Sequence, residues 1–162
     1  MDKNQALINY LLTCEPIKNS PLYFNLASIK SGVTQLIPLT QDKAINTSYI
    51  DGSIDKKYSL TVITFLSISP IPIVKTADKP TASIVDLEQV QQLINWVEQQ
   101  EKDKHYPDFG EKCPVTKISV TSENPRTDQI DMTLTPPLAK YSFTIEVFYT
   151  DKSDVIWEQK HN

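Results

Sequence analysis

The segment from Tyr141 to Tyr149 constrains the fold more than any other feature of this sequence. Large apolar or aromatic side chains occupy every second position and polar ones stand between them: Tyr141, Phe143, Ile145, Val147 and Tyr149 against Ser142, Thr144 and Glu146. Successive side chains of a β-strand point to opposite faces, so a period of two places the five large residues together. The segment therefore predicts a strand with one face packed on a core.

Five other segments have extended character. Residues 22–29 and 58–66 alternate in the same way, residues 115–120 and 130–134 are shorter strands, and residues 36–39 form a brief extended piece. Pro38 lies in the last of these segments and has no backbone N–H to give to a ladder. Residues 36–39 are therefore expected at a sheet edge or at a strand end.

Two helices are predicted from apolar repeats of helical period. In residues 3–13 the repeat is formed by Leu7, Ile8, Leu11 and Leu12, and Glu15-Pro16 is expected to end the helix. The second and longer helix covers residues 86–104, with Asp86 as N-cap and Gln89 as its capping-box partner. Its apolar face is expected to pack across the sheet and consists of Leu87, Val90, Leu93, Ile94 and Val97.

The polar segments lie between these elements and at the C-terminal end of the chain. Residues 40–56 form either a loop or a pair of thin strands that turn at Asp51-Gly52, a strong turn signal. Residues 69–80 are rich in proline and predict an extended connector. Residues 151–162 form a polar tail that is either a short docking segment around Trp157 or a disordered end.

The order of these elements indicates one α+β domain. Helix, three strands, helix and three strands follow one another (α-β-β-β-α-β-β-β), and strands in runs favour a mostly antiparallel sheet with two helices packed on it. A chain of 162 residues suits one domain. We place the domain at residues 1–150 and treat 151–162 as the tail.

Composition argues against several classes of partner. The formal net charge is -4 and the densest basic spot is the pair Lys56-Lys57, whereas a protein that grips nucleic acid usually presents a basic face. No apolar run approaches the roughly 20 residues that cross a membrane, and the N-terminus has no signal peptide. The two cysteines, Cys14 and Cys113, are expected to be reduced, buried and inert.

We find no pattern that predicts catalysis, a cofactor or a metal. The sequence has three isolated glycines and no phosphate-binding loop. Its histidines are His105, expected to be exposed at a helix end, and His161 in the tail. A zinc site needs about four ligands at recognisable spacing, and the cysteines and histidines are too scattered. We therefore expect a protein that is not an enzyme, although a small ligand-binding or enzymatic domain remains an alternative.

The chain resembles the tail terminator proteins of long-tailed phages and prophages of Gram-positive hosts. No single landmark is specific, and the resemblance lies in their order from about residue 6 to residue 150. The landmarks are ALINYLLTC (6–14), YIDGS (49–53) with KY (57–58), INWVEQQ (94–100), YPDFG (106–110), CPVTKI (113–118) and LAKYSF (138–143). Two features depart from the family: a long, proline-rich stretch at 67–85 and the tail beyond Tyr149.

The resemblance implies a structural virion protein that is assembled in the host cytoplasm. Its copies would form a homo-hexameric ring that caps the tail tube, stops tube growth and binds the head-tail connector. Genomic DNA would pass through the channel without specific binding, and no membrane would be involved. The alternative within this class is another neck or head-completion protein of a phage or phage-tail-like particle.

A ring requires a contact between subunits, and the polar segment 40–56 is long enough to provide one. Its charges either set the register between subunits or face solvent. Trp157 joins this set because a large aromatic side chain in a tail usually docks on a partner. The candidate subunit or tube interface therefore comprises Asp42, Lys43, Asp51, Asp55, Lys56, Lys57 and Trp157.

Overall fold

The computed structural model describes residues 2–18, 21–25, 32–45, 48–67, 82–121, 127–131, 133–135 and 137–155. For residues 40–42, 82–87, 89 and 127–130 it describes the backbone and not the side chains. The proline-rich stretch 69–80 and Trp157 lie outside this part of the chain. The predictions made for them stay predictions.

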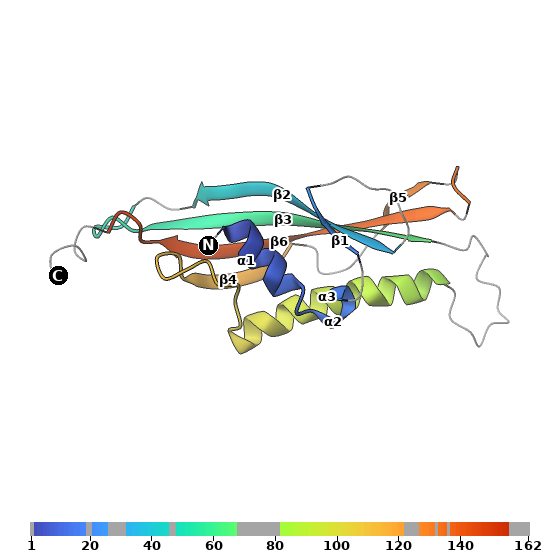
Figure 1. Ribbon diagram of the computed structural model, residues 1–162, viewed down its shortest axis with the longest axis horizontal. Helices are drawn as coiled ribbons and strands as arrows, with labels where there is room; N and C mark the ends of the chain where they lie inside the picture. The colour runs from blue at the N-terminus through green and yellow to red at the C-terminus, as the bar shows by residue number, and fades with distance from the viewer. Residues whose placement is uncertain are drawn as a thin grey trace.

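The strands form a six-stranded, mostly antiparallel sheet (Figure 1). The main order is β1-β2-β3-β6-β4, and β5 also pairs with β6. Only β1 and β2 are parallel, and the other pairs are antiparallel. The predicted α+β class with a mostly antiparallel sheet is confirmed. The strands are β1 (Leu22–Phe24), β2 (Val33–Ala44), β3 (Ile54–Ser67), β4 (Val115–Val120), β5 (Thr127–Asp131) and β6 (Leu138–Asp151).

The two longest strands, β3 and β6, pair along their whole length and carry the core. Tyr58 stands opposite Val147 and Leu60 opposite Ile145 in this register. All four side chains are buried, as are Tyr141, Phe143 and Tyr149 at 4% exposure or less. The intervening Ser142, Thr144 and Glu146 are only partly buried. The period of two in the sequence therefore identified the covered face of β6 correctly.

Three helices supply the other half of the core: α1 (Lys3–Leu11), α2 (Glu15–Lys18) and α3 (Ala82–Asp103). Figure 1 shows α1 in front of the strands and α3 running alongside them, next to β4. Asp2 caps α1, because its Oδ1 accepts a hydrogen bond from the N–H of Asn4 at 3.1 Å. Tyr10 of α1 and Trp96 of α3 bring their rings to 5.1 Å. The helices bury Ala6, Leu7, Leu11, Ile17, Val90, Leu93, Ile94 and Val97.

Two details of the helices differ from expectation. The first helix ends at Leu11, before Glu15-Pro16 as expected, but Pro16 is then the second residue of a further helix, α2, since proline fits the first turn of a helix, where its missing N–H has no intrahelical partner. Asp86 is not an N-cap, because α3 begins earlier, at Ala82. An aspartate is also tolerated inside a helix, so the apolar repeat alone could not locate the first turn. The two expected helices become three.

The strand boundaries differ in a similar way. β1 ends at Phe24, and Asn25 adopts a left-handed conformation at φ +50, while residues 26–29 of the predicted strand lie outside the described part of the chain. β2 extends well beyond the predicted 36–39, and β5 lies at 127–131 rather than 130–134. β4 occupies the predicted residues 115–120. Pro38 lies just past the residues of β2 that pair with β1, where β2 borders the described sheet. Its edge position is confirmed.

Candidate assembly interface

In the polar segment 40–56, the described residues 40–45 and 48–56 form a β-hairpin that connects β2 and β3. The N–H of Ile45 donates to the carbonyl of Asp55 at 2.9 Å, and the N–H of Tyr49 donates to the carbonyl of Ser53 at 2.8 Å. The N–H of Gly52 closes the turn on the carbonyl of Tyr49 at 2.9 Å. Of the two sequence interpretations, the strand pair that turns near Asp51-Gly52 is correct.

The turn is held by its own polar residues. Oδ1 of Asp51 accepts hydrogen bonds from the Oγ of Ser53 at 2.7 Å and from the N–H of Ser53 at 2.9 Å. These bonds stabilise the carboxylate and lower the pKa of Asp51. Gly52 adopts φ +90, a conformation that glycine reaches without steric cost.

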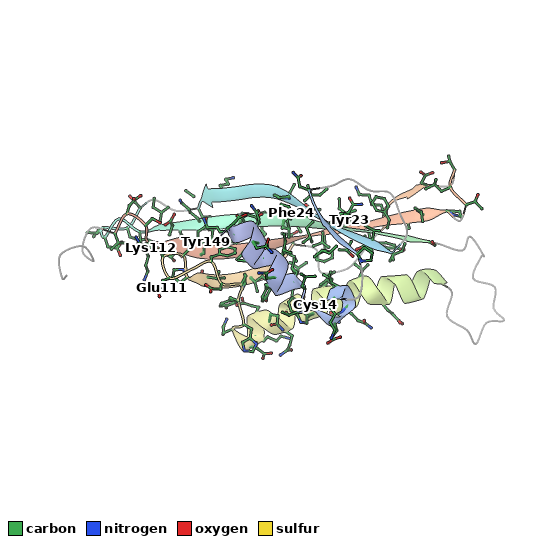
Figure 2. All side chains as sticks on the ribbon, in the orientation of Figure 1. Cys14, Tyr23, Phe24, Glu111, Lys112 and Tyr149 are labelled. Atoms are coloured by element: carbon green, nitrogen blue, oxygen red, sulfur yellow. The ribbon has the colours of Figure 1, made fainter. Side chains whose placement is uncertain are left out.

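The hairpin turn also packs on the segment that follows β6. A Cβ placed on Gly52 would lie 2.7 Å from the carbonyl oxygen of Asp154, so the two backbones are in close contact. The N–H of Lys152 donates to the carbonyl of Lys112 at 2.8 Å. Figure 2 shows Lys112 toward the end of the molecule where the hairpin turn lies. The tip of the hairpin is thereby fixed to the body of the domain.

Like Asp51, three more of the predicted interface residues bind groups within the subunit. Lys56 Nζ lies 2.7 Å from Asp151 Oδ2, and Lys57 Nζ lies 2.6 Å from Glu146 Oε1. All four of these side chains are partly buried. Asp55 accepts a hydrogen bond from the Tyr49 hydroxyl at 2.5 Å and one from the Thr150 hydroxyl at 2.8 Å. These charges therefore hold the base of the hairpin to β6.

The remaining members of the predicted set are placed differently. Lys43 is exposed and stands opposite Lys57 in the register of β2 and β3. Asp42 belongs to β2, but its side chain is outside the described part of the structure, as is Trp157. A role of any of the seven residues in contacts between subunits stays a prediction.

Sequence reasoning missed the feature that distinguishes this hairpin, which is its exposed apolar side chains. Ile50 at the turn is 99% exposed, and Leu39, Tyr49 and Ile45 are 61%, 49% and 46% exposed. Exposed apolar residues mark an interaction site only where they form a contiguous patch, and of these four residues Tyr49 and Ile50 are neighbours at the turn. The sequence does contain a signal, because apolar residues interrupt an otherwise polar segment. The predicted interface was instead based on the charged residues of that segment.

The opposite border of the sheet is closed by a side chain. The backbone N–H of Ile118 in β4 donates to Glu101 Oε2 at 2.8 Å, and Lys104 Nζ lies 2.8 Å from Glu101 Oε1. Burial alone would raise the pKa of Glu101, but the hydrogen bonds from Ile118 and Lys104 outweigh it and lower that pKa. An edge strand whose N–H groups are satisfied is a poor template for another strand.

An open hollow lies between α1 and the segment that follows α3. It has a volume of about 300 Å³ and is lined by Ala6, Asn9, Tyr10, Tyr106, Pro107 and Asp108. This volume is at the low end of small-molecule sites, which span roughly 300–1,000 Å³. The lining is mostly apolar, with Asn9 and Asp108 as the exposed polar members.

Groups that could carry chemistry are sparse in the described residues. Within this part of the chain, no cluster of three or more His, Cys, Asp or Glu side chains is placed to hold a metal ion. Cys14 and Cys113 are buried, as predicted, and burial raises the pKa of Cys14 to about 11. His105 is exposed beyond the end of α3, also as predicted. None of the helices described is both long and apolar enough to span a membrane.

The sequence matches no protein-family model, and a comparison with curated proteins also gives no match.

Proposed function

We propose that this chain is a structural subunit of a phage tail or a phage-derived particle, and specifically a tail terminator. The observation that carries the proposal is the apolar tip of the β2–β3 hairpin, with Ile50 almost fully exposed. The ordered sequence landmarks that resemble tail terminators support the same assignment, and one of them, residues 49–53, forms the hairpin turn itself.

The energetics of the tip favour a binding role. Burying an isoleucine side chain contributes about 2 kcal/mol relative to leaving it in water, and burial of the adjacent Tyr49 would add to this. The contacts of Gly52 with Asp154 and of Lys56 with Asp151 hold the tip in place before binding. A tip that is already ordered loses little conformational freedom on binding. These features suit a subunit that contributes an arm to a permanent assembly.

In this role the chain would act as a homo-hexameric ring on the last layer of the tail tube. One face would bind the tail-tube protein and stop its polymerisation, and the other would bind the head-tail connector. DNA would pass through the opening. A weakly acidic chain would let DNA slide, because like charges repel and do not hold.

Tube growth provides the test. Purified tail-tube protein of the same particle is polymerised with and without this chain, and tube lengths are measured by negative-stain electron microscopy. We expect shorter tubes with added density at one end. Tubes grown with an Ile50→Asp variant should be as long as tubes grown in the absence of this chain. Tubes of unchanged length with bare ends in the presence of the wild-type chain would contradict the proposal.

A further inference from the structure

Asp51-Gly52 is the only place in the sequence where glycine follows an aspartate or an asparagine. Such a pair is prone to rearrange, because glycine has no side chain to keep its backbone nitrogen away from the preceding carboxyl group. The pair forms the turn of the β2–β3 hairpin, next to the exposed Ile50. A change in the covalent structure of this pair would therefore act on the hairpin tip itself.

The rearrangement needs no enzyme and no co-reactant other than water. The backbone nitrogen of Gly52 attacks Cγ of the protonated Asp51 carboxyl group. A C–N bond forms, the bond from Cγ to the hydroxyl oxygen breaks, and the hydroxyl leaves with the amide proton as water. Water then hydrolyses the resulting five-membered succinimide. When it opens the ring at the main-chain carbonyl of Asp51, the chain continues through the Asp51 side chain as isoaspartate, and the backbone is longer by one methylene group.

The folded turn occupies both reacting groups. The N–H of Gly52 donates to the carbonyl of Tyr49 at 2.9 Å. Oδ1 of Asp51 accepts hydrogen bonds from the N–H of Ser53 at 2.9 Å and from its Oγ at 2.7 Å, and Ser53 is only 5% exposed. The bonds from Ser53 favour the charged carboxylate, whereas ring closure needs the neutral carboxyl group. Ring closure therefore competes with three hydrogen bonds of the turn.

We propose that Asp51-Gly52 is a site of spontaneous isomerisation to isoaspartate, and that the hydrogen bonds of the folded turn suppress this reaction. The turn also has little room for the product. A Cβ on Gly52 would lie 2.7 Å from the carbonyl oxygen of Asp154, so a longer backbone at this point has to move away from Asp154. Isomerisation would thereby displace Ile50. The inference concerns the covalent lifetime of the hairpin tip and does not depend on the proposed ring.

Asp131 provides a matched control within the same chain. Its Oδ1 accepts hydrogen bonds from the N–H of Thr133 at 2.9 Å and from its Oγ1 at 2.6 Å, which is the arrangement seen at Asp51. The residue that follows it is Met132 instead of glycine. A side chain at this position hinders the approach of the backbone nitrogen to the carboxyl group. Asp131 should therefore stay unmodified in the folded and in the unfolded chain.

Peptide mapping of aged protein tests the inference. The full chain is incubated near neutral pH, both folded and unfolded in urea. It is then digested with a protease that cleaves before aspartate but not before isoaspartate, and mass spectrometry measures the uncleaved fraction at residues 51 and 131. We expect at least about tenfold more isoaspartate at residue 51 in the unfolded chain, because the hydrogen bonds to the carboxylate are lost there.

Ser53→Ala removes one of the two donors to Asp51. The folded variant should isomerise at residue 51 about fivefold faster than the folded wild type, as the loss of one hydrogen bond would give. Circular dichroism establishes that the variant is folded, and the comparison of folded with unfolded wild type does not depend on it. Equal rates in folded and unfolded wild type would overturn the inference, as would the absence of isoaspartate at residue 51 from both. An unchanged rate in folded Ser53→Ala would contradict the suppression by Ser53.

Discussion

Glu101 of α3 and Ile118 of β4 are joined by a hydrogen bond in which the backbone N–H of Ile118 donates to Oε2 of the carboxylate at 2.8 Å. β6 pairs with the other side of β4, so this N–H belongs to the outer border of the sheet. One helix side chain therefore occupies a backbone N–H of β4 that could otherwise pair with another strand.

Replacing Glu101 should expose this border. Glu101→Ala removes the acceptor of the Ile118 N–H, and we expect the free energy of unfolding to fall by about 1–2 kcal/mol. Glu101→Gln keeps an acceptor oxygen and should lose less. The matched control is Glu98→Gln on the exposed face of the same helix, which should change stability by under about 0.5 kcal/mol. Urea unfolding measures all three, and an equal effect of Glu101→Ala and Glu98→Gln would contradict this account.

The ion pair between Lys56 and Asp151 predicts how stability depends on pH. Burial alone would raise the pKa of Asp151, but hydrogen bonds from Lys56 and Ser153 outweigh it and lower the pKa to about 2, from an ordinary value of 3.8. The unfolded chain therefore binds the proton more readily than the folded one. The stabilisation is complete above pH 3.8 and is lost as the pH falls toward 2.

Thermal unfolding between pH 6 and pH 2 provides the measurement. We expect the loss of stability below about pH 4 to include about 1–2 kcal/mol from this carboxylate. In Asp151→Asn that part of the pH dependence should disappear. Asp154→Asn changes an exposed carboxylate nearby and should retain the wild-type profile. An identical profile for Asp151→Asn and wild type would show that the ion pair does not couple folding to pH.

Gly52 and Gly110 have nearly the same backbone conformation, so replacing each by alanine distinguishes the cost of backbone strain from the cost of a steric contact. Gly52 and Gly110 adopt φ +90 and φ +92, but only a Cβ on Gly52 would meet another atom, the carbonyl oxygen of Asp154 at 2.7 Å. Gly110→Ala should therefore cost about 1 kcal/mol for the left-handed conformation. Gly52→Ala should cost about 2–3 kcal/mol, because the turn must also move away from Asp154. If urea unfolding gives equal losses of unfolding free energy for Gly52→Ala and Gly110→Ala, the turn is not held against Asp154.

The buried thiol of Cys14 should be unreactive in the folded protein. Burial raises its pKa to about 11, so almost no thiolate is present near neutral pH. We expect Cys14 to react with an aromatic disulfide reagent at pH 8 only when denaturant is added. Mass spectrometry after proteolysis identifies the modified residue. Rapid labelling of Cys14 in the native protein would indicate that α1 and α2 open readily.

Much of the fold was predictable from the sequence because one face of each element is apolar. The period of two in residues 141–149 and the helical repeat around Val90, Leu93 and Val97 identified buried faces correctly. The ends of elements were less predictable. Proline fits the start of a helix as well as the end of one, as Pro16 shows. Strands extend into polar residues wherever a neighbouring strand pairs with them, as β2 does beyond Pro38.

The candidate site was only partly predictable, for a physical reason. Lys56, Lys57 and Asp55 were recognised as charged residues in a polar segment, but their partners Asp151, Glu146 and Thr150 lie about 90 residues away along the chain. Only the register of β3 and β6 brings these groups together. Whether an apolar residue such as Ile50 faces the core or the solvent also depends on tertiary packing, which the local pattern does not contain.

Ile50→Asp separates assembly from folding. The side chain is 99% exposed, so its replacement should change the free energy of unfolding by less than about 0.5 kcal/mol. We expect the same variant to abolish binding to tube ends, because a buried, unpaired carboxylate would be costly in the interface. Leu12→Asp, also at an exposed apolar position, is the control and should leave tube-end binding intact. If Ile50→Asp binds tube ends as well as the wild-type chain does, the tip is not part of the interface.

The central claim is that this chain works as a ring subunit on the end of a tail tube. Its most direct test is the mass of the chain by light scattering coupled to size-exclusion chromatography, alone and with tubes of the tail-tube protein. We predict either a hexamer in solution or a monomer that joins the tube fraction as a ring at tube ends. A chain that stays monomeric at every concentration and elutes apart from the tubes would contradict the claim.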